Sequence, residues 1–402
     1  MGKPSRILWA QVSGLAAVQG AISLTWVIYN LYLLELLTGL GFPAALGTVL
    51  LILENALAAV MEPLMGNLSD QSQRWVGSRF PQIALGIILA AACFIGIPLA
   101  AWLGSGPVRL LLPVALVLWA LAMTVFRSPA LSLLGRYAFD SQLPQAAGLL
   151  TLVGGVTGAM APLAGEWLLS LGAGITFTIG STVLLGAALV LRQVNPTRSV
   201  RTAQVQQLGQ AAEKQVRWRR LLPNLSLVFG VGVGVALGLR LLLSLLPKQY
   251  SELGAPGSQA LAAVFITVAI TALPMGTVAS RLGNRQAMGV GLIGLSIISG
   301  LILSAGTPHQ MLLLAVLAGT AFSLVSNGTL PFALSMVPAH KSGLGTGLYF
   351  SGGAVAMSLF GAGVQRLGDP SPGLGLGIAA VSFGLAILCL ALSGQAIPQT
   401  KN

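Results

Sequence analysis

Long apolar stretches, each of about 20 residues, recur along nearly the whole chain and are separated by short polar connections. A helix rises about 1.5 Å per residue, so each stretch can cross the roughly 30 Å hydrocarbon core of a bilayer. The pattern predicts twelve membrane-spanning helices. The expected spans are 8–35, 43–66, 81–103, 108–128, 146–170, 173–192, 220–246, 258–280, 286–305, 310–336, 343–365 and 373–394.

The composition agrees with this pattern. Of the 402 residues, 55% are hydrophobic and only 7% are charged, and the mean hydropathy of +0.86 lies outside the range of soluble globular proteins. The first span has a long apolar stretch and no small-residue cleavage site, so we expect it to remain in the mature protein. The sequence therefore predicts an all-α polytopic membrane protein.

The formal net charge of +12 comes from basic residues that twelve spans place almost entirely on one side of the membrane. The opposite side receives only Arg109, Lys248 and Arg366. This asymmetry follows the positive-inside rule and predicts cytoplasmic N and C termini. The basic excess is therefore a topology signal and does not indicate a nucleic-acid partner. We expect a multi-pass protein of the plasma (inner) membrane.

A single long polar segment divides the spans six and six. It predicts an N-terminal six-helix bundle over 1–192, a cytoplasmic linker over 193–219 and a C-terminal six-helix bundle over 220–402.

The two halves also repeat weak motifs. PLMGNLSD (63–70) follows the second span, and PMGTVASRLGNR (274–285) follows the eighth. In the same way, GLLTLVGGVTGAMAPLAG (148–165) has a counterpart in GLYFSGGAVAMSLFGAG (347–363). Motifs about 200 residues apart, on the same membrane side, indicate a parallel six-helix repeat. Glycines such as Gly154, Gly158 and Gly165 are expected at close helix contacts.

Three acidic residues stand eight positions apart around the second span: Glu54, Glu62 and Asp70. Counting inward, Glu54 lies about 18 Å deep, near the midplane, and Glu62 about 30 Å deep, at the cytoplasmic boundary. A charge in hydrocarbon is costly, so a midplane carboxyl that takes up and releases a proton is a functional candidate. We expect Glu54 to be the coupling site, with Glu62 as a second candidate. Arg127, near the inner end of the fourth span, is expected to reach water or form a structural ion pair.

Polar and aromatic side chains inside the spans are candidates for contact with a solute. Aromatic rings stack on apolar faces and amides supply directed hydrogen bonds, which suits a sugar or another polar organic molecule. Trp and Tyr also belong in interfacial belts, and that interpretation fits Tyr29 and Tyr32 equally well. The predicted substrate-binding residues are Gln19, Trp26, Tyr29, Asn30, Trp119 and Asn327.

At the end of the second span, Gly66 to Asp70 with Arg74 and Arg79 resembles the loop motif of the major facilitator superfamily, whose members have twelve helices in two bundles. Residues 276–285 resemble the same loop motif more weakly. Within that superfamily, residues 62–81 are similar to the glycoside-pentoside-hexuronide and sucrose-type sugar-cation symporters.

This chain departs from the symporter pattern at some positions. Its loop is less basic, and Glu62 stands where that branch has Asp, Asn or Gln. Gly158, Pro162 and Gly165 partly resemble the superfamily's antiporter motif instead.

The resemblance implies a secondary active transporter that moves a small organic solute, such as a sugar, by alternating access, coupled to a proton or another cation. It implies a gating role for Asp70, Arg74, Arg79, Arg281 and Arg285. The positive-inside rule alone is an equally good explanation of Arg74 or Arg79 taken singly. A drug/proton antiporter is one alternative. Another is a non-transporting binding or assembly factor on a transporter-like fold.

Catalysis is not expected from this sequence. It has no G-x-x-x-x-G-K-[ST] loop for ATP, and its two histidines, His309 and His340, lie near predicted loops without clustered carboxylates. The two cysteines, Cys93 and Cys389, suggest neither a disulfide framework nor a metal site. We expect no cofactor, and a monomer in the lipid bilayer.

Overall fold

The computed structural model describes residues 7–104, 106–195 and 218–393. Most of the predicted linker, 193–219, lies outside the described residues. Within the described part, twelve helical segments are long and apolar enough to cross a membrane. The predicted number of spans is confirmed.

In residues 7–104 and 106–195 the chain forms six long helices and three short ones. The long helices are α1 (Trp9–Gly39), α2 (Ala45–Trp75), α3 (Phe80–Leu103), α4 (Leu111–Leu131), α6 (Leu143–Ser170) and α7 (Ala173–Val194). A short 3-10 helix (Gly106–Leu110) precedes α4, and α5 (Leu134–Tyr137) and a second 3-10 helix (Asp140–Gln142) connect α4 to α6.

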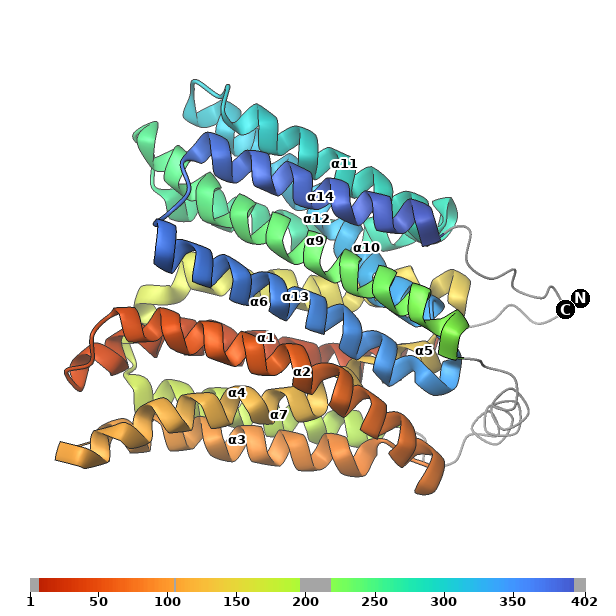
Figure 1. The fold of residues 1–402 in the computed structure, drawn as a ribbon, viewed down its shortest axis with the longest axis horizontal. Coiled ribbons are helices and arrows are strands. Elements are labelled where there is room, and N and C mark those ends of the chain that lie inside the picture. The colour runs from red at the N-terminus through yellow and green to blue at the C-terminus, as the bar shows by residue number, and fades with distance from the viewer. Residues whose placement is uncertain (1–6, 105, 196–217, 394–402) are drawn as a thin grey trace, which may run out of the picture.

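The second half repeats the arrangement. Its long helices are α9 (Trp218–Glu252), α10 (Gly257–Leu282), α11 (Asn284–Ile302), α12 (Pro308–Ser335), α13 (Ser342–Leu367) and α14 (Pro372–Ser393), and a short 3-10 helix (Ala339–Lys341) precedes α13. Each half buries its own hydrophobic core, and Leu330 and Leu334 of α12 pack into that of the first half. Between the halves, the closest packing joins α2 to α13 and α6 to α10 (Figure 1).

The start of α1, the end of α7, the start of α9 and the end of α14 lie at one end of the molecule, on the right in Figure 1. At this end the Leu8 amide donates to the Tyr137 carbonyl at 2.9 Å, and the Tyr137 hydroxyl donates to Asn195 at 2.9 Å. We call it the terminal end. Six spans in each half bring the chain back to the same side, as an even count requires.

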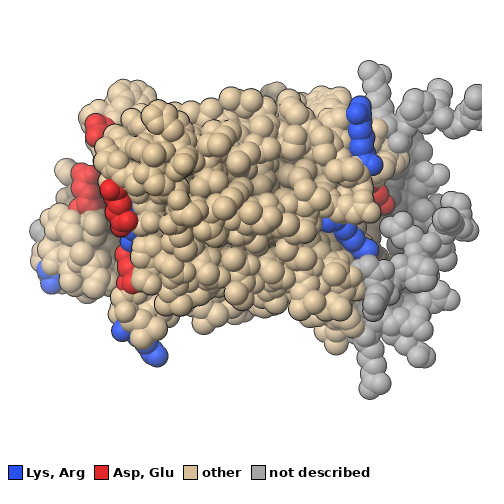
Figure 2. All heavy atoms as spheres, turned by 90° about the horizontal axis from the view of Figure 1, so that it is seen from above, with Lys and Arg blue, Asp and Glu red and all other residues tan. Residues whose placement is uncertain are grey.

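Charged side chains lie mainly at the two ends of the molecule. On the face shown in Figure 2, Lys, Arg, Asp and Glu flank a broad middle band that lacks them. Apolar side chains of the long helices are exposed, including Ile88, Val381 and Ile270 at 58%, 74% and 72% exposure. This surface suits a lipid environment. That the terminal end faces the cytoplasm stays a prediction.

Helix α2 differs most from its predicted bounds. It continues to Trp75, nine residues past the predicted end at 66, and therefore carries Asp70 and Arg74 on a helix and not in a loop. The apolar stretch of a sequence marks how much of a helix contacts lipid, not where the helix ends. Here the polar last turns pack against protein, since Ser69 and Asp70 are 0% and 1% exposed.

Glycines allow the halves to approach closely. A Cβ on Gly66 would collide with the backbone oxygen of Gly343, and one on Gly343 would collide with that of Gly66. Of the glycines predicted at helix contacts, Gly158 packs against the Phe265 ring, whereas a Cβ on Gly154 would meet nothing within 4 Å and would face open space. The neighbouring Gly155 makes the contact instead, since a Cβ there would lie 2.6 Å from the Ala269 nitrogen.

Candidate functional site

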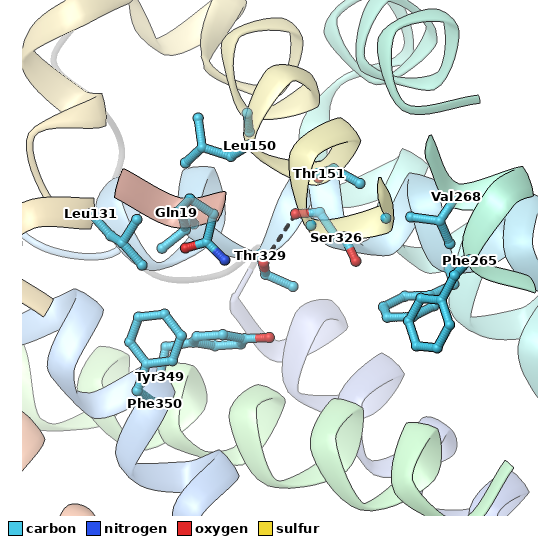
Figure 3. A pocket seen from close by; sticks show the side chains of 15 residues that line it. Gln19, Leu131, Leu150, Thr151, Phe265, Val268, Ser326, Thr329, Tyr349 and Phe350 are labelled. Atoms are coloured by element: carbon cyan, nitrogen blue, oxygen red, sulfur yellow. Dashed lines mark hydrogen bonds between the residues drawn. The ribbon is translucent and has the colours of Figure 1, made fainter. Parts of the chain in front are cut away.

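A cavity of about 250 Å³ lies between the two halves of the molecule (Figure 3). Helices α1, α4 and α6 supply one side of its wall, and α10, α12 and α13 supply the other. None of its lining residues carries a charge. The polar lining residues are Gln19, Thr151, Ser326, Thr329 and Tyr349. The aromatic ones are Phe265, Phe322, Tyr349 and Phe350.

Most polar groups of the wall are partly engaged with the protein. The Gln19 amide nitrogen donates to the Ser23 hydroxyl at 3.2 Å, and the Thr329 hydroxyl donates to the Ser326 carbonyl at 3.1 Å (Figure 3). The Tyr349 hydroxyl interacts with the Thr329 side chain. The wall therefore offers a solute only a few directed hydrogen bonds.

The repeated motif places one cavity residue from each half in an equivalent position. Thr151 stands three residues before Gly154 in the α6 motif, and Tyr349 stands three residues before Gly352 in the α13 motif. Both side chains line the cavity. The weak internal repeat thus marks two facing helices of the site.

Glu54 lies outside this wall, in the interior of the first half. It is 3% exposed, and the Tyr29 hydroxyl donates to its Oε1. Its Oε2 has no hydrogen-bond partner, and no basic side chain pairs with Glu54 among the described residues. Trp119 stacks on Tyr29 with ring centres 4.6 Å apart and contacts Trp26 at 4.8 Å. Because Tyr29 and Tyr32 are 0% and 1% exposed, the interfacial-belt interpretation of these tyrosines is wrong.

Glu62 has a different environment, one that includes a cation. Arg127 Nη2 lies 2.5 Å from Glu62 Oε1, and the Ser128 hydroxyl donates to Oε2. The Arg127 guanidinium also stands over the Phe350 ring of the cavity wall, 4.5 Å from its centre. Glu62 is fully buried, and α2 continues more than three turns beyond it, to Trp75. The expected depth of Glu62 at the cytoplasmic boundary stays a prediction. Arg127 forms the structural ion pair that was one of its two expected roles.

Asp70 and Arg79 join the halves at the terminal end. Both Asp70 oxygens accept from the first turn of α13, at 2.9 Å from the Gly343 amide and 2.9 Å from the Leu344 amide. Arg79 Nη2 donates to Asp70 at 2.5 Å and to the Ser342 hydroxyl at 2.9 Å. A carboxylate at a helix N-terminus satisfies amides that have no partner within the helix and interacts favourably with the helix dipole. We call Asp70, Arg79 and residues 342–344 the latch.

The second half has a weaker equivalent of the latch. Near the end of α10, the Ser280 hydroxyl accepts from the Gln145 amide at the start of α6, at 3.2 Å. Arg281 and Arg285, predicted to gate by analogy, are exposed, and in the described part of the chain no ion pair joins either to a carboxylate. Arg74 lies exposed in the last turn of α2.

Only Gln19 among the six predicted substrate-binding residues lines the cavity. Trp26, Tyr29 and Trp119 form the aromatic cluster beside Glu54 described above. Asn30 is exposed and donates to the carbonyl of Trp26 in its own helix at 2.7 Å. Asn327 is fully buried and ties α12 to α10 by donating to the Ala272 carbonyl at 2.8 Å.

Sequence reasoning missed most of the cavity wall, including Phe265, Thr329, Tyr349 and Phe350. A signal for two of these residues was present, because Tyr349 and Phe350 lie inside the repeated motif of the eleventh span. That motif indicates an internal repeat, and repeat-related helices face each other across the centre of such a molecule. Phe265 and Thr329 carry no comparable signal.

The arrangement of two six-helix halves around a central cavity agrees with the comparison to protein families. A model of the Major Facilitator Superfamily matches residues 15–361, which is most of the chain. The chain belongs to the Major Facilitator Superfamily. Its family and its structural neighbours are transporters and not enzymes.

Solved structures of this superfamily share the fold. The proton:xylose symporter XylE bound to 6-bromo-6-deoxy-D-glucose superposes with a TM-score of 0.74 at 12% identity, over 98% of this chain and 97% of that one. The human organic anion transporter MFSD10 (TETRAN) superposes with a TM-score of 0.67 at 15% identity, over 97% of this chain and 100% of that one. No curated protein sequence matches the chain. At these identities the likeness shows the fold alone.

Proposed function

We propose that this protein is a secondary active transporter that moves a small organic solute across the plasma membrane by alternating access, driven by a proton. The observation that carries the proposal is the cavity of about 250 Å³ between the halves, walled by helices of both. A solute held there contacts two bodies that can rock against each other, which is the geometry that alternating access requires.

The closure of the terminal end supports this mechanism. The latch and the Ser280–Gln145 hydrogen bond join the halves there, on α2–α13 and α6–α10 respectively. These are polar contacts between helix ends, and they can break without unpacking either hydrophobic core. We infer that their release opens the cavity toward the terminal end.

Two buried carboxyls are candidates for the proton. Glu54 has one hydroxyl donor and no cation beside it, so its charged form is poorly compensated inside the membrane. Glu62 is paired with Arg127, which contacts the cavity wall through Phe350. We propose Glu54 as the proton-coupling residue and the Glu62–Arg127 pair as the link between coupling and the cavity.

Purified protein in liposomes with an imposed pH gradient tests both parts of the proposal. A panel of sugars, neutral aromatic compounds and lipophilic ions should contain at least one solute whose uptake or efflux follows the gradient. Glu54→Gln should abolish gradient-driven accumulation but retain solute counterflow, which needs no net proton movement. Glu35→Gln, at an exposed position of α1, is the matched control and should accumulate solute normally.

Each alternative has its own outcome in this assay. Gradient-driven sugar uptake would support the sugar-symporter resemblance, and solute efflux against proton influx would indicate an antiporter. Full accumulation by Glu54→Gln would exclude Glu54 as the coupling residue. No gradient-dependent flux of any compound in the panel would favour a binding or assembly factor.

A further inference from the structure

The chemistry of the cavity wall restricts what the proposed transporter carries. None of the lining residues has a charged side chain. Arg127, which stands over the Phe350 ring of the wall, is not among the lining residues and is paired with Glu62 at 2.5 Å. An ionised solute would leave water for a wall with no counter-charge, and such a transfer is strongly unfavourable.

The cavity wall also offers few hydrogen-bonding groups. Five polar side chains line the cavity, and Gln19, Thr329 and Tyr349 already use part of their capacity within the protein. A monosaccharide carries four or five hydroxyl groups, each a donor and an acceptor. Hydroxyls that lose water without gaining a protein partner disfavour binding. A polyol is therefore a poor match for this wall.

Four aromatic rings line the cavity together with aliphatic side chains. Phe265 and Phe322 make one edge-to-face pair with ring centres 6.4 Å apart, and Tyr349 and Phe350 make another at 5.4 Å. Figure 3 shows Phe265 across the cavity from Tyr349 and Phe350, with the Thr329 side chain between them. A flat apolar body fits between such rings, and the central hydroxyls can orient one polar group on it.

The motif that suggested a sugar lies elsewhere in the molecule. Within residues 62–81, Glu62 pairs with Arg127 and Asp70 and Arg79 belong to the latch, and none of the motif's residues lines the cavity. The motif therefore concerns contacts away from the cavity, and the cavity wall determines which solute binds.

We propose that the cavity takes a small uncharged organic molecule with a flat apolar or aromatic body and one or two hydrogen-bonding groups, in preference to a polyol or an ion. This rests on the proposed transport function, because it treats the cavity as the solute site. The cavity volume of about 250 Å³ is small for a ligand site, so the body is one or two rings in size.

Four probes of similar size test the class of solute. Benzamide, benzoate and benzamidinium share one shape and differ in charge, and glucose supplies the polyol. Each is added to the purified full-length protein, and its effect on the thermal unfolding midpoint is measured. We expect benzamide at about ten times its dissociation constant to raise the midpoint by about 1–3 °C, and the other three to leave it unchanged. An equal or larger shift with benzoate, benzamidinium or glucose, or no shift with benzamide, overturns the proposal.

Variants of the wall locate the binding. Thr329→Val and Tyr349→Phe each remove one hydroxyl and should weaken benzamide binding by about 3–10-fold. Thr178→Val, on the exposed side of α7, makes the same chemical change away from the cavity and should not alter it. Ser326→Asp adds a counter-charge to the wall and should allow benzamidinium to stabilise the protein. Benzamide binding unaffected by both wall variants would place it outside the cavity and contradict the proposal.

Binding and transport are then separated with a pH dye inside liposomes. If benzamide binds selectively but neither it nor any compound of the transport panel evokes proton flux, the transport proposal fails and the solute class stands. If glucose evokes proton flux while benzamide does not bind, transport stands and the solute class fails.

Discussion

At the scale of single residues, two acids on one face of α2 are held in contrasting ways. Glu54 and Glu62 are eight residues apart, so they point within about 80° of each other. Glu54 meets a neutral hydroxyl and Glu62 meets a guanidinium. A proton on Glu54 disrupts no ion pair, whereas a proton on Glu62 leaves Arg127 without its counter-ion. The two sites should therefore respond differently to substitution.

Removing Arg127 should expose this difference as a loss of stability. Arg127→Met leaves the fully buried Glu62 without its cation, which should destabilise the protein by about 3–5 kcal/mol. The double variant Glu62→Gln, Arg127→Met removes both charges and should recover most of that loss. The free energies of unfolding of the single and double variants are measured in detergent, with circular dichroism as the signal. Equal destabilisation of the single and double variants would show that the pair contributes through packing and not through charge.

At the scale of helices, the contact between α2 and α13 depends on backbone touching backbone. Gly66 and Gly343 face each other so closely that neither position has room for a methyl group. On the same two helices, the Ser351 hydroxyl donates to the Ala59 carbonyl at 2.5 Å, farther from the latch. Small residues let helices in lipid approach closely enough for such contacts.

Gly66→Ala should therefore separate α2 from α13 at the terminal end. Cysteine at position 326 of the cavity, in a chain lacking Cys93 and Cys389, should then react several-fold faster with a membrane-impermeant maleimide added from that side. Gly96→Ala on α3, where a Cβ would have nothing within 4 Å, is the control and should not change the rate. Unchanged labelling in Gly66→Ala would mean that this contact does not close the cavity.

The position of each helix along the chain could be predicted from the sequence, but the rotation of each helix about its own axis could not. The hydrophobic run fixes each span because its length matches the bilayer, and this gave twelve helices with errors of up to nine residues at their ends. A span that is apolar all round does not reveal which side faces a neighbour, so Asn327 was expected at the solute site although it ties α12 to α10. For the same reason the sequence did not reveal that Glu62 on α2 faces Arg127 on α4.

At the scale of the whole molecule, the latch concentrates the closing contacts at one end. Asp70→Asn removes the charge that holds Arg79 and weakens the acceptors for the first turn of α13. Spin labels are attached at the exposed positions 75 on α2 and 282 on α10. In Asp70→Asn the distances between the two labels should be longer and more broadly distributed than in the protein that retains Asp70. Hydrogen bonds to a charged group contribute about 1.5–3 kcal/mol, enough to shift the closed population by about tenfold or more.

An acid at the opposite end supplies the control for this measurement. Asp369 pairs with Lys248 at 2.5 Å on the surface, where both side chains are more than half exposed. Asp369→Asn should leave the distance between positions 75 and 282 unchanged. The same broadening in both variants would point to general loosening of the protein and contradict a specific role for the latch.

The lack of charge in the cavity wall has an electrical consequence. If the solute is neutral too, then the only charge that crosses the membrane in one cycle is the proton. Each elementary charge gains about 2.3 kcal/mol from a potential of 100 mV, so voltage alone should drive accumulation even when the pH is equal on both sides. The current through a planar bilayer containing the protein, divided by the solute flux, would then count the protons carried with each molecule.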